Sequence, residues 1–285
     1  IKIARRYFHK KNNSKTKNEI ITFEGSFHGR TIGSLAAGGP DKLESFNTTV
    51  NGFKHIEFGN HELLKKEINE NTAAIIIEPI QGEGGIREVP SECLKGIRKI
   101  CDENDILLIF DEVQCGVGRT GKMFAHEWSD TVPDIMTVAK AIGNGFPLGA
   151  CLTSKTVGST MDFGSHGSTY GGNPLASVVG NAVLDIMLEK NFFNNVDNVS
   201  KNLFAGLQLI QKDFPEVIEL VRGKGLMLGI KCKVKNTDFV ENARTNKLLS
   251  VKASDNVVRL MPPLILNIKE CNEGLEKIRS TCESF

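Results

Sequence analysis

The chain has 285 residues, which is enough for one large domain or two modest ones. Its apolar content of 40% and charged content of 24% are ordinary for a globular enzyme, and a net charge of +1 argues against a nucleic-acid-binding surface. No apolar run approaches the roughly 20 residues that cross a bilayer, so we expect no membrane partner. The seven cysteines lack the spacing of zinc or redox sites, which predicts free thiols in a reducing cytoplasm and no metal site.

The first residues, Ile1-Lys2-Ile3-Ala4-Arg5-Arg6-Tyr7, are amphipathic and basic and include no Met. They do not have the form of a signal peptide. They are typical of the middle of a helix, which has therefore lost its cap. We expect an N-terminally truncated fragment or a processed product.

Four short apolar runs in the first half of the chain predict strands at 20–23, 73–77, 106–110 and 134–138. Such nearly continuous runs indicate strands that are buried on both faces, as in a parallel sheet. Helical patterns lie between them. In one of these, Ser91 is the expected N-cap, and Leu94, Ile97 and Ile100 form the inner face. The alternation of strand and helix predicts an α/β fold.

The pattern changes after Pro174. We expect one long helix from there to Leu188 and a second over about 196–214. Short strands near 217–221, 226–232 and 257–260 and a last helix from about Ile268 complete the chain. These elements predict a smaller α+β domain. We therefore divide the chain into a large domain, 1–175, and a connecting helix with a small C-terminal domain, 176–285.

Two charged side chains end neighbouring predicted strands. Lys140 follows 134–139 and precedes a glycine-broken loop, and Asp111 directly follows 106–110. Alone, such a lysine is usually a solvated surface residue and such an aspartate usually caps a turn. Together they lie where ligands bind open α/β sheets. Pyridoxal phosphate fits both groups, because it forms a Schiff base with a lysine and sets its ring nitrogen against a carboxylate. A desolvated lysine would be nucleophilic there.

Other residues near these strand ends suit the same cofactor. Val113 can pack against a ring face, and Gln114 can hydrogen-bond a ring hydroxyl. A single Phe is usually core, but Phe27 lies between glycines in a loop, where stacking on a planar cofactor would give it a partner. Arg30 follows in that loop. An exposed arginine is ordinary, but its guanidinium suits bidentate binding of a carboxylate.

Two further loops carry candidate residues. Glu83, in the loop 79–85, is either a solvated charge or the partner of an arginine that it switches on and off as a carboxylate receptor. Arg259 is the candidate partner, because a charge flanked by apolar residues should be paired. The loop 164–174 precedes a helix and is rich in hydroxyls and glycines. It suits an anion, although alone it is typical of a generic loop.

Six segments, in their combined order and spacing, resemble the class III, fold-type I aminotransferases, which use pyridoxal phosphate. They are FHGRTIGSLAAGG (27–39), AAIIIEPIQGEGG (73–85), LLIFDEVQCGVGRTGKMFAHE (107–127), PDIMTVAKAIGNGFPLGA (133–150), HGSTYGGNPLA (166–176) and RGKGLMLGI (222–230). The resemblance covers essentially the whole chain and is closest to the acetylornithine branch. It implies a mixed, mostly parallel sheet sandwiched by helices, with a smaller C-terminal α+β domain.

The resemblance also implies a role for each candidate. Lys140 resembles the catalytic Schiff-base lysine and acid/base. Cofactor contacts are implied for Phe27, Asp111, Val113, Gln114, Lys140 and Thr169, and substrate contacts for Arg30, Glu83, Ser168 and Arg259. Among these, Glu83 and Arg259 resemble a gating pair. Ser168 and Thr169 resemble residues donated to the neighbouring subunit's site, which implies a homodimer with active sites at its interface.

The activity implied is transamination of N2-acetyl-L-ornithine with 2-oxoglutarate, in cytoplasmic arginine biosynthesis. Ornithine, succinylornithine and 4-aminobutyrate aminotransferases share this chemistry and remain alternatives. A non-catalytic binding module of the same fold is a distant alternative, because one fold hosts many functions. A nucleotide-binding domain is disfavoured because no G-x-G-x-x-G or P-loop stands in the right context.

The sequence departs from the family in one respect. The family has a serine or glycine followed by Gly-Thr or Gly-Ala at the cofactor phosphate, upstream of its first large-domain helix. That element would precede Ile1. We therefore expect the full-length enzyme to be active and this fragment to bind the cofactor poorly.

Overall fold

A computed structural model describes residues 1–12 and 16–285, which form two compact units. The first unit comprises Ile1–Pro79, Val89–Gln114 and His126–Val183, and the second comprises Ile80–Glu88, Cys115–Ala125 and Leu184–Phe285. Two short segments from the first half of the chain thus belong to the second unit. The domain division at residue 175 stays a prediction.

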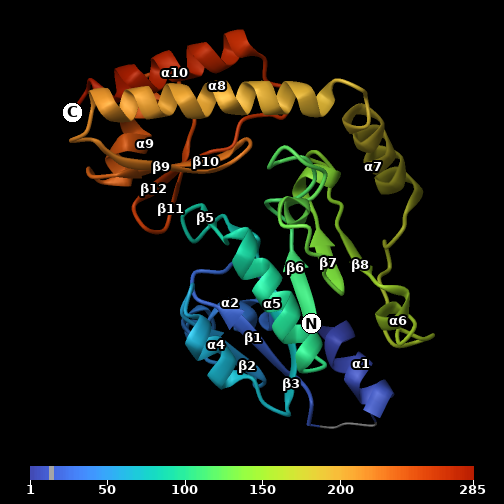
Figure 1. Ribbon diagram of the computed structural model, residues 1–285. Coiled ribbons are helices and arrows are strands. Elements are labelled where there is room, and N and C mark those ends of the chain that lie inside the picture. The colour runs from blue at the N-terminus through green and yellow to red at the C-terminus, as the bar shows by residue number, and fades with distance from the viewer. Residues whose placement is uncertain (13–15) are drawn as a thin grey trace. The chain divides into compact units, whose positions relative to one another are not determined.

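The first unit is built on a six-stranded sheet with the order β2-β1-β3-β6-β7-β8 (Figure 1). Its neighbouring strands are all parallel except β7 and β8, which are antiparallel. The predicted mixed, mostly parallel sheet is therefore confirmed, and all four expected strands are present. The strands are β1 (Glu19–Phe23), β2 (Phe53–Ile56), β3 (Thr72–Ile77), β6 (Leu107–Asp111), β7 (Ile135–Val138) and β8 (Ala150–Thr153).

Helices cover both faces of this sheet, because alternate residues of a buried strand point to opposite sides. On one face, Ile75 and Ile77 of β3 pack with α4 (His61–Glu67) and α5 (Ser91–Glu103). On the other face, Ala74 and Ile76 pack with α1 (Lys2–Asn12) and α6 (Lys155–Gly158). The shorter elements are α2 (Ile32–Gly38), α3 (Asp41–Glu44) and the 3₁₀ turns η1 (Ala125–Trp128) and η2 (Lys140–Ile142).

Helix α5 differs from expectation in two details. It begins at Ser91, with Pro90 as its N-cap, because the carbonyl of Pro90 accepts the first helical N–H groups. The prediction that Ser91 is the N-cap was therefore wrong. Ile100 is only partly buried, and Cys101 takes its place on the inner face with Leu94 and Ile97. Seven residues after Leu94, Cys101 completes the 3.6-residue stripe more closely than Ile100.

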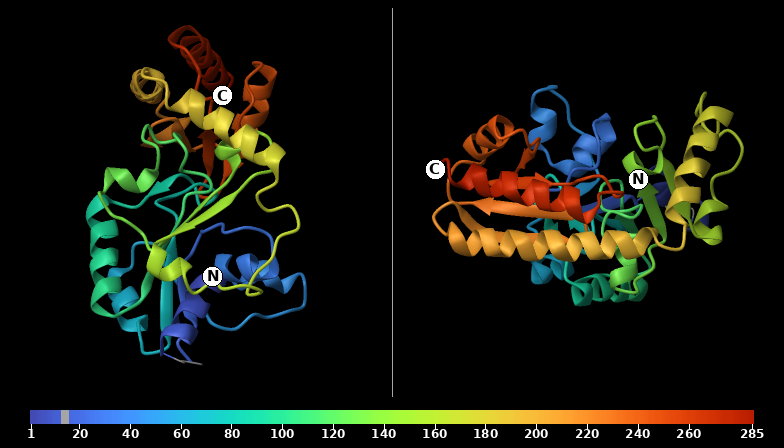
Figure 2. Two further views of the ribbon diagram at one scale, coloured as in Figure 1. Left: turned by 90° about the vertical axis from the view of Figure 1, so that its right-hand side faces the viewer. Right: turned by 90° about the horizontal axis from the view of Figure 1, so that it is seen from above.

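The second unit is α+β. Its four-stranded antiparallel sheet has the order β11-β12-β10-β9. Helices α8 and α10 lie side by side against it, as the views of Figure 2 show, and they share a core that includes Leu207, Ile278 and Phe239. The elements are β9 (Ile218–Lys224), β10 (Met227–Cys232), β11 (Val251–Ala253), β12 (Val257–Leu260), α8 (Phe192–Asp213), α9 (Asn236–Thr245) and α10 (Ile268–Cys282), with the separate pair β4 (Ile80–Gln81) and β5 (Arg87–Glu88).

Helix α7 (Pro174–Met187) joins the two units, where a long connecting helix was expected. Several of its apolar side chains are exposed, among them Leu175, Val178 and Ile186. In the part of the chain that the structure describes, no helix combines the length and apolar character needed to span a membrane.

Candidate active site

Asp111 and Lys140 come from adjacent strands of the first unit. Asp111 is the last residue of β6 and pairs in register with Thr137 of β7. Lys140 follows three residues after Thr137, just beyond the end of β7. Because parallel neighbours end at the same edge of a sheet, the carboxylate and the amine arise at the edge where α/β enzymes bind ligands.

The carboxylate of Asp111 is buried and held by several donors. Its Oδ2 lies 2.8 Å from Nδ1 of His28, and its Oδ1 accepts hydrogen bonds from the hydroxyl of Thr137 at 3.2 Å and the N–H of Val113 at 3.1 Å. Donors on both oxygens fix the plane of the carboxylate.

His28 is a residue that the sequence did not single out. Its side chain is 2% exposed, and its Nε2 is buried with no hydrogen-bond partner among the described residues. Its position directly after Phe27 was the only available signal, because the pairing with Asp111 joins residues 83 positions apart.

Lys140 has a backbone φ of +49°. That region costs a residue other than glycine roughly 1–2 kcal/mol, and such strain gathers at functional sites. Its side chain is exposed and has no hydrogen bond or carboxylate partner within residues 1–12 and 16–285. The lysine starts the turn η2 at the open end of β7, and its desolvation in a cofactor pocket stays a prediction.

The loop after Lys140 needs its glycines. A side chain at Gly143 would meet the carbonyl oxygen of Phe146 at 2.2 Å, and Gly145 has a φ of +104°. Replacing either glycine by another residue would therefore cost conformational energy. The tight turn keeps Lys140 at the strand end.

Phe27 lies in the loop that follows β1 and is partly buried. Its backbone N–H donates to Oε1 of Glu78 at 2.8 Å, and Glu78 is itself 4% exposed at the end of β3. The guanidinium carbon of Arg30 lies 5.4 Å from the centroid of the Phe27 ring. Arg30 is exposed and has no carboxylate partner in the described chain, so its guanidinium group can bind an anion.

Glu112 fixes the chain directly after Asp111. Its side chain is fully buried and accepts from the N–H of His126 at 2.9 Å, while His126 Nδ1 lies 2.7 Å from the same oxygen. The N–H of Glu112 also donates to the carbonyl of Thr137. Val113 and Gln114 follow as partly buried residues. No pattern in the sequence pointed to this contact between Glu112 and His126.

The expected pair of Glu83 and Arg259 is present within the second unit. Arg259 Nη1 lies 2.6 Å from Glu83 Oε1, with 11% of the arginine side chain and 39% of the glutamate side chain exposed. Backbone bonds hold the glutamate loop against the sheet: Ser254 N–H donates to Glu83 O, and Arg222 Nε donates to Gly85 O. The ion pair reaches water on its glutamate side, so a ligand can compete for the arginine.

Ser168 and Thr169 lie in the loop before α7, and their side chains are exposed. They extend from the first unit without contributing to its core. Exposed hydroxyls in a loop at a helix N-terminus can bind an anion of another molecule.

Known proteins are similar to this chain along nearly its whole length. The sequence profile of the family "Aminotransferase class-III" matches residues 1–282. The chain is 52% identical to the acetylornithine aminotransferase of Mesorhizobium japonicum over 98% of its own length and 70% of that protein. It is also 52% identical to the enzyme of the same name from Agrobacterium fabrum, over 100% of the chain and 71% of that protein.

Solved structures show the same fold. The crystal structure of N-acetylornithine aminotransferase from Stenotrophomonas maltophilia matches with a TM-score of 0.84 and 36% identity, over 100% of this chain and 71% of that chain. Ornithine aminotransferase from Toxoplasma gondii, crystallised with partial occupancy of PLP, matches with a TM-score of 0.94 and 27% identity, over 99% and 69%. The chain therefore spans about 70% of the length of these relatives.

Proposed function

The chain belongs to the class III aminotransferases, and we propose that it transfers the δ-amino group of N2-acetyl-L-ornithine to 2-oxoglutarate. The products are N-acetyl-L-glutamate 5-semialdehyde and L-glutamate. The observation that carries this proposal is the high identity to acetylornithine aminotransferases along nearly the whole chain. Together with Asp111 and Lys140 at the same edge of the sheet, it also argues against a non-catalytic module of the same fold.

Pyridoxal phosphate is the cofactor of this chemistry, and when bound it supplies an aldehyde carbon that takes up amino groups and a ring that withdraws electrons. The residues of the site fit this group. The carboxylate of Asp111 is fixed in orientation, and the buried Nε2 of His28 beside it is a polar atom without a partner in the described chain. The exposed Lys140 provides the amine.

Each residue then has a defined task. Asp111 places its negative charge against the ring nitrogen and keeps that nitrogen protonated, and His28 positions Asp111. Phe27 and Val113 would flank the ring of the bound cofactor, and Gln114 would bind its hydroxyl. Lys140 Nζ would take the proton from the substrate carbon that bears the amino group. Such a positioned acid/base contributes typically 10²–10⁴-fold to a rate.

Substrate carboxylates have two receptors. Arg30 binds the α-carboxylate of N2-acetyl-L-ornithine, whose reacting amine is at the other end of the molecule. Arg259 is paired with Glu83 in the structure described, and this pair stays closed while the donor is bound. When 2-oxoglutarate enters, its carboxylate next to the reacting carbon displaces Glu83 and takes Arg259. The switch at Arg259 lets the enzyme accept both N2-acetyl-L-ornithine and 2-oxoglutarate, although the two substrates differ in shape.

The active enzyme is a homodimer in this proposal. Ser168 is donated to the substrate of the neighbouring subunit and Thr169 to its cofactor phosphate. Two observations support this: both side chains are exposed, and α7 directly after them exposes apolar residues. Large exposed apolar patches mark association surfaces. We also propose that the enzyme acts in the cytoplasm, in arginine biosynthesis.

Ornithine is the second candidate donor, because an ornithine aminotransferase matches the fold closely. Succinylornithine and 4-aminobutyrate are further alternatives. Differences in pocket walls of this kind are worth about 1–3 kcal/mol, or roughly 10–200-fold. Measuring kcat/KM for the four donors with 2-oxoglutarate tests the proposal. N2-acetyl-L-ornithine is expected to be best by at least tenfold, and a higher value for any other donor would overturn the substrate assignment.

A further inference from the structure

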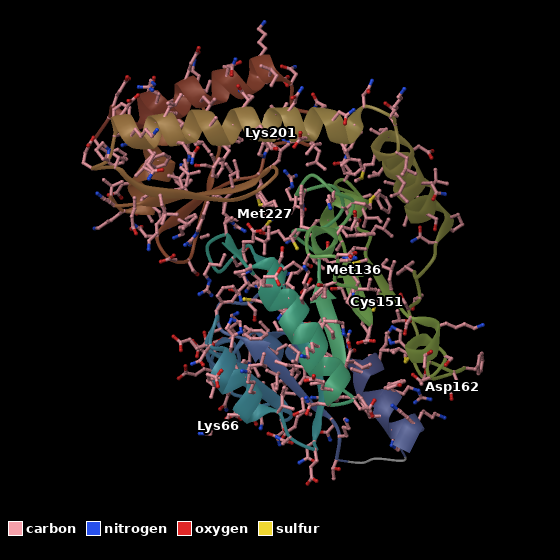
Figure 3. The ribbon with its side chains drawn as sticks, in the orientation of Figure 1. Lys66, Met136, Cys151, Asp162, Lys201 and Met227 are labelled. Carbon is pink, nitrogen blue, oxygen red and sulfur yellow. The ribbon has the colours of Figure 1, made fainter. Side chains whose placement is uncertain are left out.

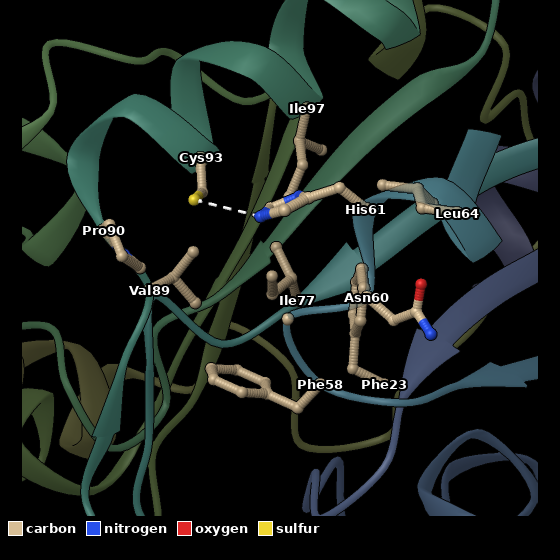
Figure 4. Close-up of a pocket in the computed structure, with 11 residues that line it drawn as sticks. Phe23, Phe58, Asn60, His61, Leu64, Ile77, Val89, Pro90, Cys93 and Ile97 are labelled. Carbon is tan, nitrogen blue, oxygen red and sulfur yellow. Dashed lines mark hydrogen bonds between the residues drawn. The ribbon is translucent and has the colours of Figure 1, made fainter.

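A cavity of about 140 Å³ lies on the face of the first unit's sheet that α4 and α5 cover (Figure 4). Its lining is mostly apolar, and Figure 4 shows the side chains of Phe58, Val89 and Ile97 around it. Its lining includes none of the residues assigned to transamination. The cavity is therefore open to a separate role.

Two reactive side chains meet at this cavity. Cys93 Sγ lies 3.3 Å from His61 Nε2, the contact drawn as a dashed line in Figure 4. His61 is the first residue of α4, and Cys93 is the third residue of α5. Cys93 is partly exposed and His61 is exposed, so a reagent can reach the sulfur from solvent.

Most other cysteines are shielded. Burial raises the pKa of Cys101, Cys232 and Cys282 to about 12, which keeps these thiols protonated. Cys115 and Cys271 are buried as well, and Cys151 on β8 (Figure 3) is the one other cysteine with an exposed side chain in the described chain. Cys93 alone combines access with a histidine contact.

The surroundings of Cys93 favour nucleophilic chemistry. The thiolate is the reactive form of cysteine, so a base beside the thiol that can take its proton promotes the reaction. His61 provides such a base at 3.3 Å, and Cys93 lies in the first turn of the 13-residue α5. His61 Nε2 is placed to accept the thiol proton. This pair differs from a solitary surface cysteine.

We propose that Cys93 is a covalent modification site for small apolar α,β-unsaturated carbonyl compounds. The thiol proton passes to His61 Nε2, and Sγ forms a bond to the β carbon of the compound. The π electrons of the C=C bond move to the α carbon, which then takes the proton from His61. The product is a one-to-one adduct, and the addition needs no oxidant and releases no leaving group.

The cavity explains why the preferred compound is apolar. Phe23, Leu64 and Ile77 complete a wall that offers few polar partners to a charged reagent. An alkyl tail can instead bury its surface there, and each buried CH₂ strengthens binding about fourfold. A volume of about 140 Å³ suits a short chain rather than a peptide. Oxidised glutathione, which is large and charged, fits poorly.

The test compares two enals that share the reactive group, acrolein and trans-2-hexenal, which carries three more carbons. The intact protein is treated with each, the adduct at Cys93 is followed by peptide mass spectrometry, and each rate is divided by the rate with N-acetylcysteine. We expect the normalised rate at Cys93 to be at least about tenfold higher for trans-2-hexenal. We expect no such preference at Cys151 in the same sample.

Two variants separate the histidine from the cavity wall. His61→Gln is expected to lower both rates at Cys93 about tenfold or more, and Phe58→Ser to lower only the rate with trans-2-hexenal. Equal normalised rates for the two enals in the unmodified protein would overturn the proposal without recourse to any variant. So would an unchanged rate in His61→Gln, or faster modification of Cys93 by oxidised glutathione.

Discussion

At the scale of single residues, the candidate active site depends on how Asp111 is held. Its two oxygens have different partners: His28 at one, and Thr137 with the backbone of Val113 at the other. A carboxylate fixed in this way presents its charge in one direction and needs no reorientation during turnover. The ring of His28 contributes the shortest of these contacts and is the side chain whose removal tests the arrangement best.

We expect His28→Phe to lower kcat roughly 10- to 100-fold, because a hydrogen bond to a charged group is worth about 1.5–3 kcal/mol. The variant keeps a planar ring but removes both ring nitrogens, including the Nδ1 that contacts Asp111. Steady-state kinetics with N2-acetyl-L-ornithine give kcat, and an absorbance titration gives the dissociation constant of pyridoxal phosphate. Thr137→Val, which removes the longer 3.2 Å bond, should have a smaller effect. A wild-type kcat in His28→Phe would show that Asp111 needs no support.

We expect Glu83→Gln to shift the balance between the two substrates. Without the negative charge, Arg259 stays available to a carboxylate, so the KM for 2-oxoglutarate should fall. The kcat/KM for N2-acetyl-L-ornithine should also fall, by about tenfold, because the free arginine faces a donor end that has no carboxylate. Steady-state kinetics with both substrates measure the two changes. An equal loss of kcat/KM for both substrates would argue against a gate.

Some of this site could be predicted from the sequence and some could not. Asp111 and Lys140 could be predicted because each stands at the end of a buried strand. The pair of Glu83 and Arg259 could be predicted because a charge among apolar residues needs a partner. His28 and Glu112 were not, because their partners are set by how distant segments meet. The exposure of Lys140 also depends on the folded loop rather than on its neighbours in sequence.

At the scale of elements, tight turns carry the strongest constraints. The hairpin between β9 and β10 turns at Gly225, which has a φ of +60°. A side chain there would approach the backbone of Thr120 to within 2.4 Å. By contrast, Gly274 lies within α10, where a side chain would meet nothing within 4 Å.

These two glycines give a matched pair of variants. Gly225→Ala is expected to destabilise the protein by more than about 1 kcal/mol, because it adds a clash to a strained conformation. Gly274→Ala is expected to stabilise it by up to about 1 kcal/mol through helix propensity. Urea unfolding followed by circular dichroism measures both changes. Equal stabilities of the two variants would contradict the described turn.

A charge cluster on the second unit's sheet makes stability depend on pH. Although burial opposes it, hydrogen bonds from Arg222 and Lys231 hold the pKa of Asp255 below its usual value. The folded state therefore binds fewer protons than the unfolded state, so this contribution is present above about pH 4 and is lost as the pH falls further. Asp255→Asn should be less stable than the wild type at pH 7, and the difference should shrink in acid. Thermal unfolding at pH 7 and below pH 4 tests this, and a difference that is independent of pH would contradict it.

Elements buried on both faces were predicted closely, because their composition alone identifies them. Strand β3 begins one residue earlier than expected, and β6 is shifted by one residue at both ends. Strands β2 and β8 were missed, since β2 is only half-buried and β8 is largely exposed at the sheet edge. The allocation of Ile80–Glu88 to the second unit also had no local signal, because it rests on contacts with β9 and the β11–β12 turn.

At the scale of the whole molecule, the proposal requires a second subunit. We expect Val178→Glu, on the exposed apolar side of α7, to weaken dimerisation at least about 30-fold, because a charge buried without a partner at an interface costs 2 kcal/mol or more. Sedimentation velocity should then show a monomer with reduced activity. Leu209→Glu on α8 makes the same kind of change at another exposed residue and should leave the dimer intact. A fully active wild-type monomer would refute the shared site.

The most direct test of the account is the visible absorption spectrum of the full-length protein with added pyridoxal phosphate. A band from the cofactor joined to Lys140 should appear, and N2-acetyl-L-ornithine should bleach it within one turnover. In Lys140→Ala the band should be missing, even if the cofactor still binds. An unchanged band in that variant would contradict the central claim that the amine of Lys140 carries the chemistry.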